Sequence, residues 1–119
     1  MSKDFARQQA QKRGLFAESL AAGFLRLKGY KIVERNYKTK FGEIDIIARK
    51  GDLIAIVEVK ARANVQAAID SVSYEASRRI ENTADHWLAK QEDYHLLSTR
   101  FDIIAIEPSK WPAHLKDAF

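Results

Sequence analysis

Apolar positions recur along this chain with two different periods, and the change of period separates helices from strands. From Leu15 to Leu27 the apolar residues are three or four positions apart, which is the repeat of one helix face. We expect a helix over residues 14–28, ended by Gly29. Residues 1–13 are polar and basic without such a period and predict a flexible arm or an extra helical turn. The main domain is therefore expected over residues 14–119.

The middle of the chain has the composition of strands. Residues 30–38 are rich in β-branched and aromatic side chains and predict a first strand. Residues 42–62 predict two further strands around a turn at residues 50–52. Residues 63–69 have neither period, and we expect a loop there.

The second half of the chain predicts one long helix and at least one strand. Apolar residues repeat every four positions there: Val72, Ala76, Ile80, Ala84 and Leu88. The segment 94–108 then predicts one or two strands, stopped by Pro108. We expect a short tail over residues 111–119, anchored by Trp111, Leu115 and Phe119.

The resulting order, α-β-β-β-α-β in 119 residues, predicts a single-domain α/β/α sandwich with a mixed sheet. A long helical crossover joins the third and fourth strands. These strands should therefore run parallel, with a right-handed connection.

Charged side chains occur on the polar positions of the predicted hairpin. A two-residue turn at residues 51–52 would pair Asp45 with Glu58 and Glu43 with Lys60. Two opposed carboxylates repel each other unless a cation or a proton lies between them. Magnesium is bound in proteins by one or two carboxylates, waters and a substrate phosphate. Such an ion, with the Lys60 ammonium beside it, suits phosphodiester hydrolysis.

Strand alternation defines the expected faces of this hairpin. Glu43, Asp45 and Ile47 should share one face, and Ile44 and Ile46 the other. The alternative interpretation of the charged residues is a solvated cross-strand ion pair. Helices covering the sheet would argue against it, because they would leave the polar face of the hairpin unsolvated.

Overall composition narrows the classes of function and site. Lys and Arg number 20 against 16 Asp and Glu, a net charge of +4 that mildly favours anionic partners. Cysteine is absent, so disulfides and thiolate metal sites are excluded and any metal must bind oxygen or imidazole. No apolar run approaches the roughly 20 residues of a membrane span, and the first residues lack an apolar signal core. We expect no membrane association and a cytoplasmic protein.

In these hairpin residues the chain resembles the PD-(D/E)xK nuclease superfamily, whose core has Asp on the second strand and Glu-x-Lys on the third. More closely it resembles the UPF0102 (YraN-like) family, related to Holliday-junction resolvases. The resemblance rests on Gly14, Glu18, GEIDIIA at 42–48, VEVKAR at 57–62, RFDIIAI at 100–106 and the ending DAF. It implies an endonuclease that uses Mg2+ or Mn2+ on nucleic acid, with DNA, and branched DNA in particular, as the expected substrate.

The resemblance also assigns roles to residues around the hairpin. Asp45, Glu58 and Lys60 would be catalytic, and Glu18 would join Asp45 and Glu58 as a metal ligand. Glu43 would hold Lys60 in an ion pair or reach the metal indirectly. One departure concerns the second helix, where relatives carry a Lys-Gln pair and this chain has Ala76 and Ser77. The candidate nucleic-acid contacts are Arg62, Arg78 and Arg79.

Two other interpretations of the function remain open. The fold could be a nucleic-acid-binding module without turnover, or the acids could be a solvated patch. A homodimer is expected only by analogy with two-fold resolvases. Asp102 is expected to be a hydrogen-bonded structural carboxylate, and the three histidines, at 86, 95 and 114, lack the spacing of metal ligands.

Overall fold

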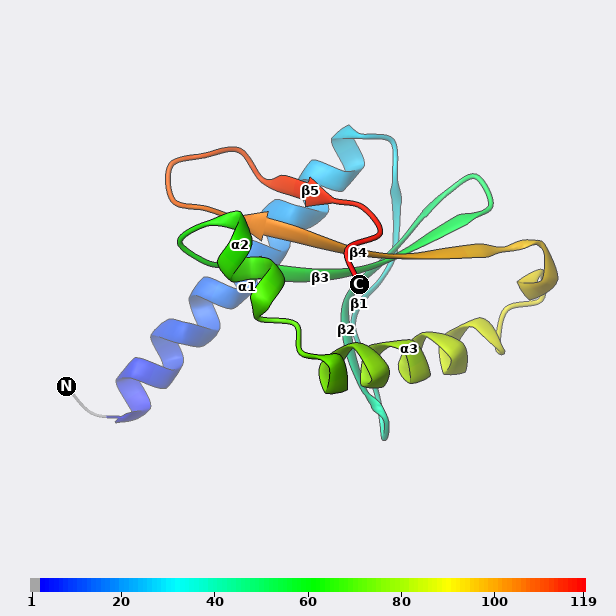
Figure 1. Cartoon of the computed structure of the whole chain (residues 1–119), viewed down its shortest axis with the longest axis horizontal. Helices are drawn as coiled ribbons and strands as arrows, with labels where there is room; N and C mark the ends of the chain where they lie inside the picture. The colour runs from blue at the N-terminus through cyan, green and yellow to red at the C-terminus, as the bar shows by residue number, and fades with distance from the viewer. Residues whose placement is uncertain (1–2) are drawn as a thin grey trace.

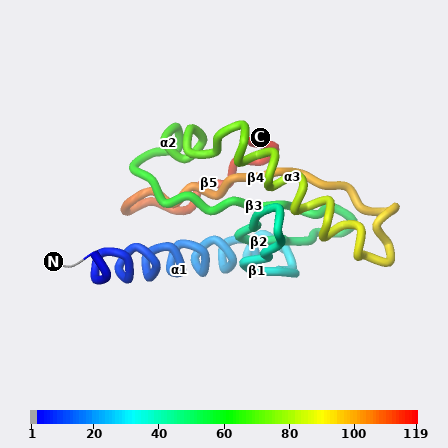
Figure 2. Tube along the Cα trace, turned by 90° about the horizontal axis from the view of Figure 1, so that it is seen from below, coloured from blue at the N-terminus to red at the C-terminus, as the bar shows by residue number. Residues whose placement is uncertain are grey.

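The computed structural model describes residues 3–119 as a five-stranded sheet between two layers of helices (Figure 1). Its elements are α1 (Lys3–Leu27), β1 (Lys31–Thr39), β2 (Gly42–Lys50), β3 (Leu53–Ala61), α2 (Val65–Asp70), α3 (Tyr74–Leu88), a 3-10 turn η1 (Tyr94–Leu96), β4 (Ser98–Ile106) and β5 (Ala113–Leu115). The spatial order of the strands is their order along the chain. Helix α1 covers one face of the sheet, and α2 and α3 lie on the other (Figure 2). The predicted α/β fold is therefore confirmed.

Helix α1 is longer than the sequence pattern predicted. It begins at Lys3 rather than at residue 14, so residues 3–13 are helical, as in the predicted alternative of an extra turn but over a longer stretch, while residues 1 and 2 lie outside the described residues. Its N-terminal half extends beyond the edge of the sheet (Figure 1). The segment is rich in Ala, Gln, Lys and Arg, which favour helices without any apolar period. The predicted end is confirmed by Gly29, whose φ is 90° and whose N–H bonds Arg26 O at 3.0 Å.

Three hydrophobic clusters hold the helices to the sheet, the smallest of them Ala68 of α2 with Ile103 and Ala105 of β4. The core under α1 contains Ala21, Ala22, Leu25, Tyr30, Ile46, Ala48, Ala55, Val57 and Ile104. The core under α3 contains Ile44, Ile47, Ile54, Ile56, Ile80, Ala84 and Trp87. Each fully buried branched side chain stabilises the fold by about 1.5–3 kcal/mol relative to its exposed state. Burial on both faces explains why β2 and β3 carry near-continuous apolar runs.

The predicted register of the central hairpin is confirmed. Strands β2 and β3 pair antiparallel from Lys50 with Leu53 to Ile46 with Val57. The two-residue turn between them is possible because Gly51 adopts a φ of 63°. Strands β3 and β4 run parallel, as the helical crossover predicted.

The structure corrects the prediction for the loop and adds a strand to the tail. Helix α2 occupies most of the expected loop at 63–69, because the Asn64 side chain caps it by accepting from the Ala67 N–H at 2.8 Å. The tail contains β5, which pairs antiparallel with β4. Trp111 is 80% exposed and does not anchor the tail, whereas Leu115 and Phe119 pack against buried residues. Within residues 3–119, no helix has both the length and the apolar character needed to cross a bilayer.

Candidate active site

The candidate site lies where β2 separates from β3. Their pairing ends at Ile46 and Val57, although both strands continue. The expected strict alternation of β2 is wrong here, because Ile44 packs under α3 together with Ile47, while Ile46 packs under α1. On the neighbouring strand β1, Asn36 has a φ of 53°, a left-handed conformation that is uncommon in a strand. The end of the β1–β2 hairpin therefore turns away from β3 and leaves an opening, which we call the fork.

Asp45 and Glu58 close the fork with their side chains. Asp45 Oδ2 accepts from the Val59 N–H at 2.8 Å, and Glu58 Oε2 accepts from the Asp45 N–H at 3.2 Å. Each carboxylate thus accepts from a backbone N–H of the opposite strand, at the point where the backbone hydrogen bonds between β2 and β3 end. The two acids are close together, as predicted. They are held by hydrogen bonds from side chain to backbone, however, and not as a regular pair of opposed strand residues.

Burial of this pair disfavours two negative charges. Glu58 is 7% exposed, and its burial, followed by the charge of Asp45, raises its pKa to about 8. Burial also raises the pKa of Asp45, against the bond from Val59 and the charge of Lys60. At pH 7 the pair therefore favours a state in which one of its two carboxyls keeps a proton.

Glu18 lies beside the fork, on α1 and therefore on the sheet face that α1 covers. It is 8% exposed, and its Oε1 is buried without a hydrogen-bond partner, with Arg35 Nε 3.8 Å away. Burial, and next the charge of Asp45, raises its pKa. Among residues 3–119, no three His, Cys, Asp or Glu side chains are gathered closely enough to hold a metal ion together. The structure thus brings Asp45 and Glu58 together and leaves Glu18 beside them.

The expected ion pair between Glu43 and Lys60 is not formed. Glu43 is exposed and lies 3.8 Å from Lys38 instead, because the hairpin carries it away from β3. Lys60 is half-buried, and its charge acts to lower the pKa of both Asp45 and Glu58. In the described part of the chain its ammonium has no hydrogen bond or ion pair. Lys60 is therefore free to meet an anion at the fork.

A hollow of about 250 Å³ opens from the fork towards α3. It is lined by Gly42, Glu43, Glu58, Ala76, Arg79 and Ile80. The small Ala76 side chain borders this hollow. Of the three candidate arginines, Arg79 lines the hollow, whereas Arg78 and Arg62 are exposed outside it.

Asn36 is not among the predicted site residues, although it lies next to them. Its left-handed backbone stands at the level of Asp45, between the pairs Arg35 with Ile46 and Tyr37 with Ile44. Its amide also acts to lower the pKa of Glu18. The available signal was an Asn inside a run of β-branched and aromatic residues, because Asn tolerates left-handed backbone better than they do.

A larger hollow, of about 710 Å³, is chemically different. Most of its lining is apolar, from α1 and the segment before β5, and includes Phe16, Leu20, Phe24 and Trp111. No carboxylate lines it, so the acids of the candidate site and this hollow are separate features.

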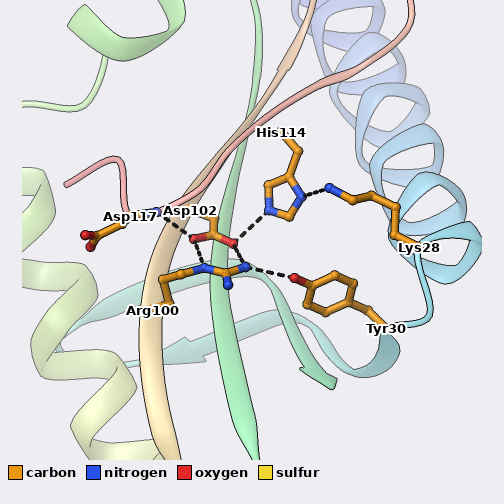
Figure 3. A network of polar contacts seen from close by, with 6 residues as sticks. All are labelled: Lys28, Tyr30, Arg100, Asp102, His114 and Asp117. Carbon is orange, nitrogen blue, oxygen red and sulfur yellow. Dashed lines mark hydrogen bonds and ion pairs between the residues drawn. The ribbon is translucent and has the colours of Figure 1, made fainter. Parts of the chain in front are cut away.

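Asp102 belongs to a buried polar network (Figure 3). Its carboxylate accepts two bonds from the Arg100 guanidinium, at 2.7 and 2.8 Å, one from His114 Nε2 at 2.8 Å and one from the Asp117 N–H at 3.0 Å. Burial raises its pKa, but the bonds from Arg100 and His114 outweigh burial and hold the pKa well below its usual range. Arg100 also donates to the Tyr30 hydroxyl at 2.8 Å. Asp102 is thus the structural carboxylate predicted, joining β4 to the tail.

The sequence comparisons agree on one family. Residues 17–106 match the family described as "Uncharacterised protein family UPF0102". The chain is 56% identical to a UPF0102 protein of Sinorhizobium fredii, over 98% of this chain and 95% of that protein. It is 52% identical to one of Mesorhizobium japonicum, over 96% and 91%, and 53% identical to one of Bartonella tribocorum, over 100% and 94%. The chain therefore belongs to the UPF0102 family.

Proposed function

We propose that this protein is an endonuclease that hydrolyses nucleic-acid phosphodiester bonds with Mg2+ or Mn2+ bound at the fork. The observation that carries the proposal is the buried Glu58 against the half-buried Asp45, with the unpaired Lys60 beside them. Two acids and an ammonium at an interruption of the sheet are unfavourable for stability alone. They become favourable when a cation and a phosphate occupy the same place.

The residues at the fork fit a magnesium-type ion. Such an ion is usually held by one or two carboxylates, with waters and substrate phosphate in the remaining positions. In the described residues, Asp45 Oδ1 and Glu58 Oε1 carry no hydrogen bond and can serve as ligands. The Oε1 of Glu18, which has no hydrogen bond and only the Arg35 guanidinium 3.8 Å away, would reach the ion directly or through water. When bound, the ion supplies Lewis-acid activation of the phosphate and of a water.

The basic residues have separate tasks in this proposal. Lys60 stabilises the negative charge that develops on the phosphate during hydrolysis. Arg79 binds a phosphate in the hollow next to the fork. Arg62 and Arg78 contribute phosphate contacts further out. The expected substrate is DNA, including branched DNA, and a homodimer remains a prediction.

A second function is supported by one observation. No three potential ligands are gathered within residues 3–119, which favours a nucleic-acid-binding module with weak or no metal affinity. In that case Arg79 and Lys60 would bind phosphate, but no hydrolysis would follow.

A cleavage assay separates the two functions. Labelled branched, single-stranded and duplex DNA, with matched RNA, would be incubated with Mn2+, Mg2+ or EDTA and native protein, Asp45→Asn or Asp52→Asn. Asp52 is an exposed acid at the far end of the same hairpin and is the matched control. Metal-dependent cleavage by the native protein and Asp52→Asn, but not by Asp45→Asn, supports the nuclease. Binding without cleavage in any metal supports the module instead.

A further inference from the structure

The tip of the β1–β2 hairpin carries an aromatic side chain that the core does not use. Phe41 is 41% exposed, and the residue before it, Lys40, places its ammonium 5.4 Å from the centre of the Phe41 ring. Residue Lys40 forms no ion pair within the described chain. An exposed aromatic ring beside a free cation combines the two features that bind a base and its phosphate.

The tip is held in place against α3. The Phe41 ring lies 6.0 Å from that of His86, and the Phe41 N–H donates to Thr39 Oγ1 at 3.1 Å. A Cβ added to Gly42 would lie 3.4 Å from both Arg79 Cβ and Thr83 Oγ1, which shows how closely the backbone approaches the helix. Phe41 is therefore a fixed platform rather than a side chain on a loose loop.

The platform and the fork lie along the same stretch of α3. Arg79 lines the hollow at the fork, and His86, which contacts Phe41, is two turns further along the helix. Gly42, the residue after Phe41, also lines this hollow. A strand held at the fork would thus pass Phe41 within its neighbouring nucleotides.

We propose that Phe41 stacks on an unpaired base of the strand that is bound at the fork, with Lys40 and Arg79 contacting its phosphates. The face of a base is open to an aromatic side chain only where the strand is not stacked inside a duplex. The preferred ligand is therefore nucleic acid with unpaired nucleotides next to the phosphate at the fork. The proposal rests on the proposed function for the assignment of the fork, but base stacking itself needs no metal.

Binding measured in EDTA tests the platform without cleavage. Fluorescence anisotropy would compare a labelled single-stranded oligonucleotide with the blunt duplex of the same sequence, for native protein, Phe41→Leu and Phe41→Trp. Phe16→Leu is the matched control, because Phe16 is an exposed aromatic on α1. Loss of one stacked base weakens binding about 5- to 150-fold. We expect this loss for Phe41→Leu on the single strand only, with native affinity for Phe41→Trp and Phe16→Leu.

The outcomes also separate this proposal from the nuclease proposal. Unchanged single-strand affinity in Phe41→Leu, or an equal loss on the duplex, would overturn the platform, whether or not the protein cleaves DNA. Restored affinity in Phe41→Trp excludes misfolding of the tip as the cause of the loss. If Phe41→Leu binds weakly and the native protein cleaves nothing in Mn2+, the platform stands and the nuclease proposal fails.

Discussion

Replacing Glu58 by Gln tests whether a negative charge on Glu58 destabilises the folded state. Glutamine keeps the size of the side chain and an oxygen that can accept from the Asp45 N–H, but it cannot ionise. In the native chain the folded state raises the pKa of Glu58 from 4.5 to about 8. Between these values the folded state binds more protons than the unfolded state. Its stability therefore falls as pH rises from about 4.5 to 8 and stays low above 8.

The size of this effect follows from proton linkage. Each tenfold difference in proton affinity between folded and unfolded chains is worth about 1.4 kcal/mol. Even a tenfold difference should shift the melting temperature of a domain of this size by roughly 3–6 °C. In EDTA at pH 9 we expect Glu58→Gln to be more stable than the native protein, with the difference shrinking towards pH 5.

Thermal and urea unfolding from pH 5 to pH 9 measure this difference directly. Glu92→Gln, at an exposed position outside the fork, controls for the loss of one negative charge. The reasoning is refuted if Glu58→Gln and the native protein show parallel stability curves, or if Gln is the less stable at pH 9. Either result would mean that the folded chain stabilises the Glu58 carboxylate rather than its protonated form.

Three further predictions concern the network, the core and the nucleic-acid surface. Asp102→Ala should destabilise the chain by about 3–5 kcal/mol in urea unfolding, because it leaves Arg100 without its buried partner; a loss under 1 kcal/mol would contradict the network. Leu25→Ala should cost about 2–5 kcal/mol, since this side chain is fully buried under α1, and a neutral result would contradict that packing. Changing Arg78 and Arg79 together to Ala should weaken nucleic-acid binding and flatten its dependence on salt, because fewer counterions are released; an unchanged slope would exclude both arginines from the interface.

Much of the fold was predictable because local signals agreed with tertiary packing. The stripe from Val72 to Leu88, the glycine at 51 and the apolar runs of β2 and β3 each specify one element and one register. The N-terminal half of α1 was missed because its helix depends on residue propensity, not on an apolar face. Helix α2 was missed because its signal is a single cap at Asn64.

The candidate site was predictable in its members and less so in its shape. Asp45 and Glu58 follow from the hairpin register, and the proximity of Glu18 was implied only by the family resemblance. The fork itself was not predicted, because strict alternation assumes a regular strand. It cannot show that Ile44 and Ile46, on either side of residue 45, face opposite sides of the sheet. Because of this change of face, Glu43 forms its ion pair with Lys38, and Lys60 is left without one. Such a result depends on how the hairpin packs on α3, which no local pattern encodes.

The most direct test of the central claim is a metal titration of thermal stability in the native protein, Asp45→Asn and Asp52→Asn. A cation that binds only the folded state stabilises it by about 2.7 kcal/mol at roughly 100 times its dissociation constant. At pH 8 with Mn2+ we predict a rise of several degrees in melting temperature for the native protein and Asp52→Asn, and none for Asp45→Asn. Equal rises in all three proteins, or no rise in the native protein, would contradict a metal site at the fork.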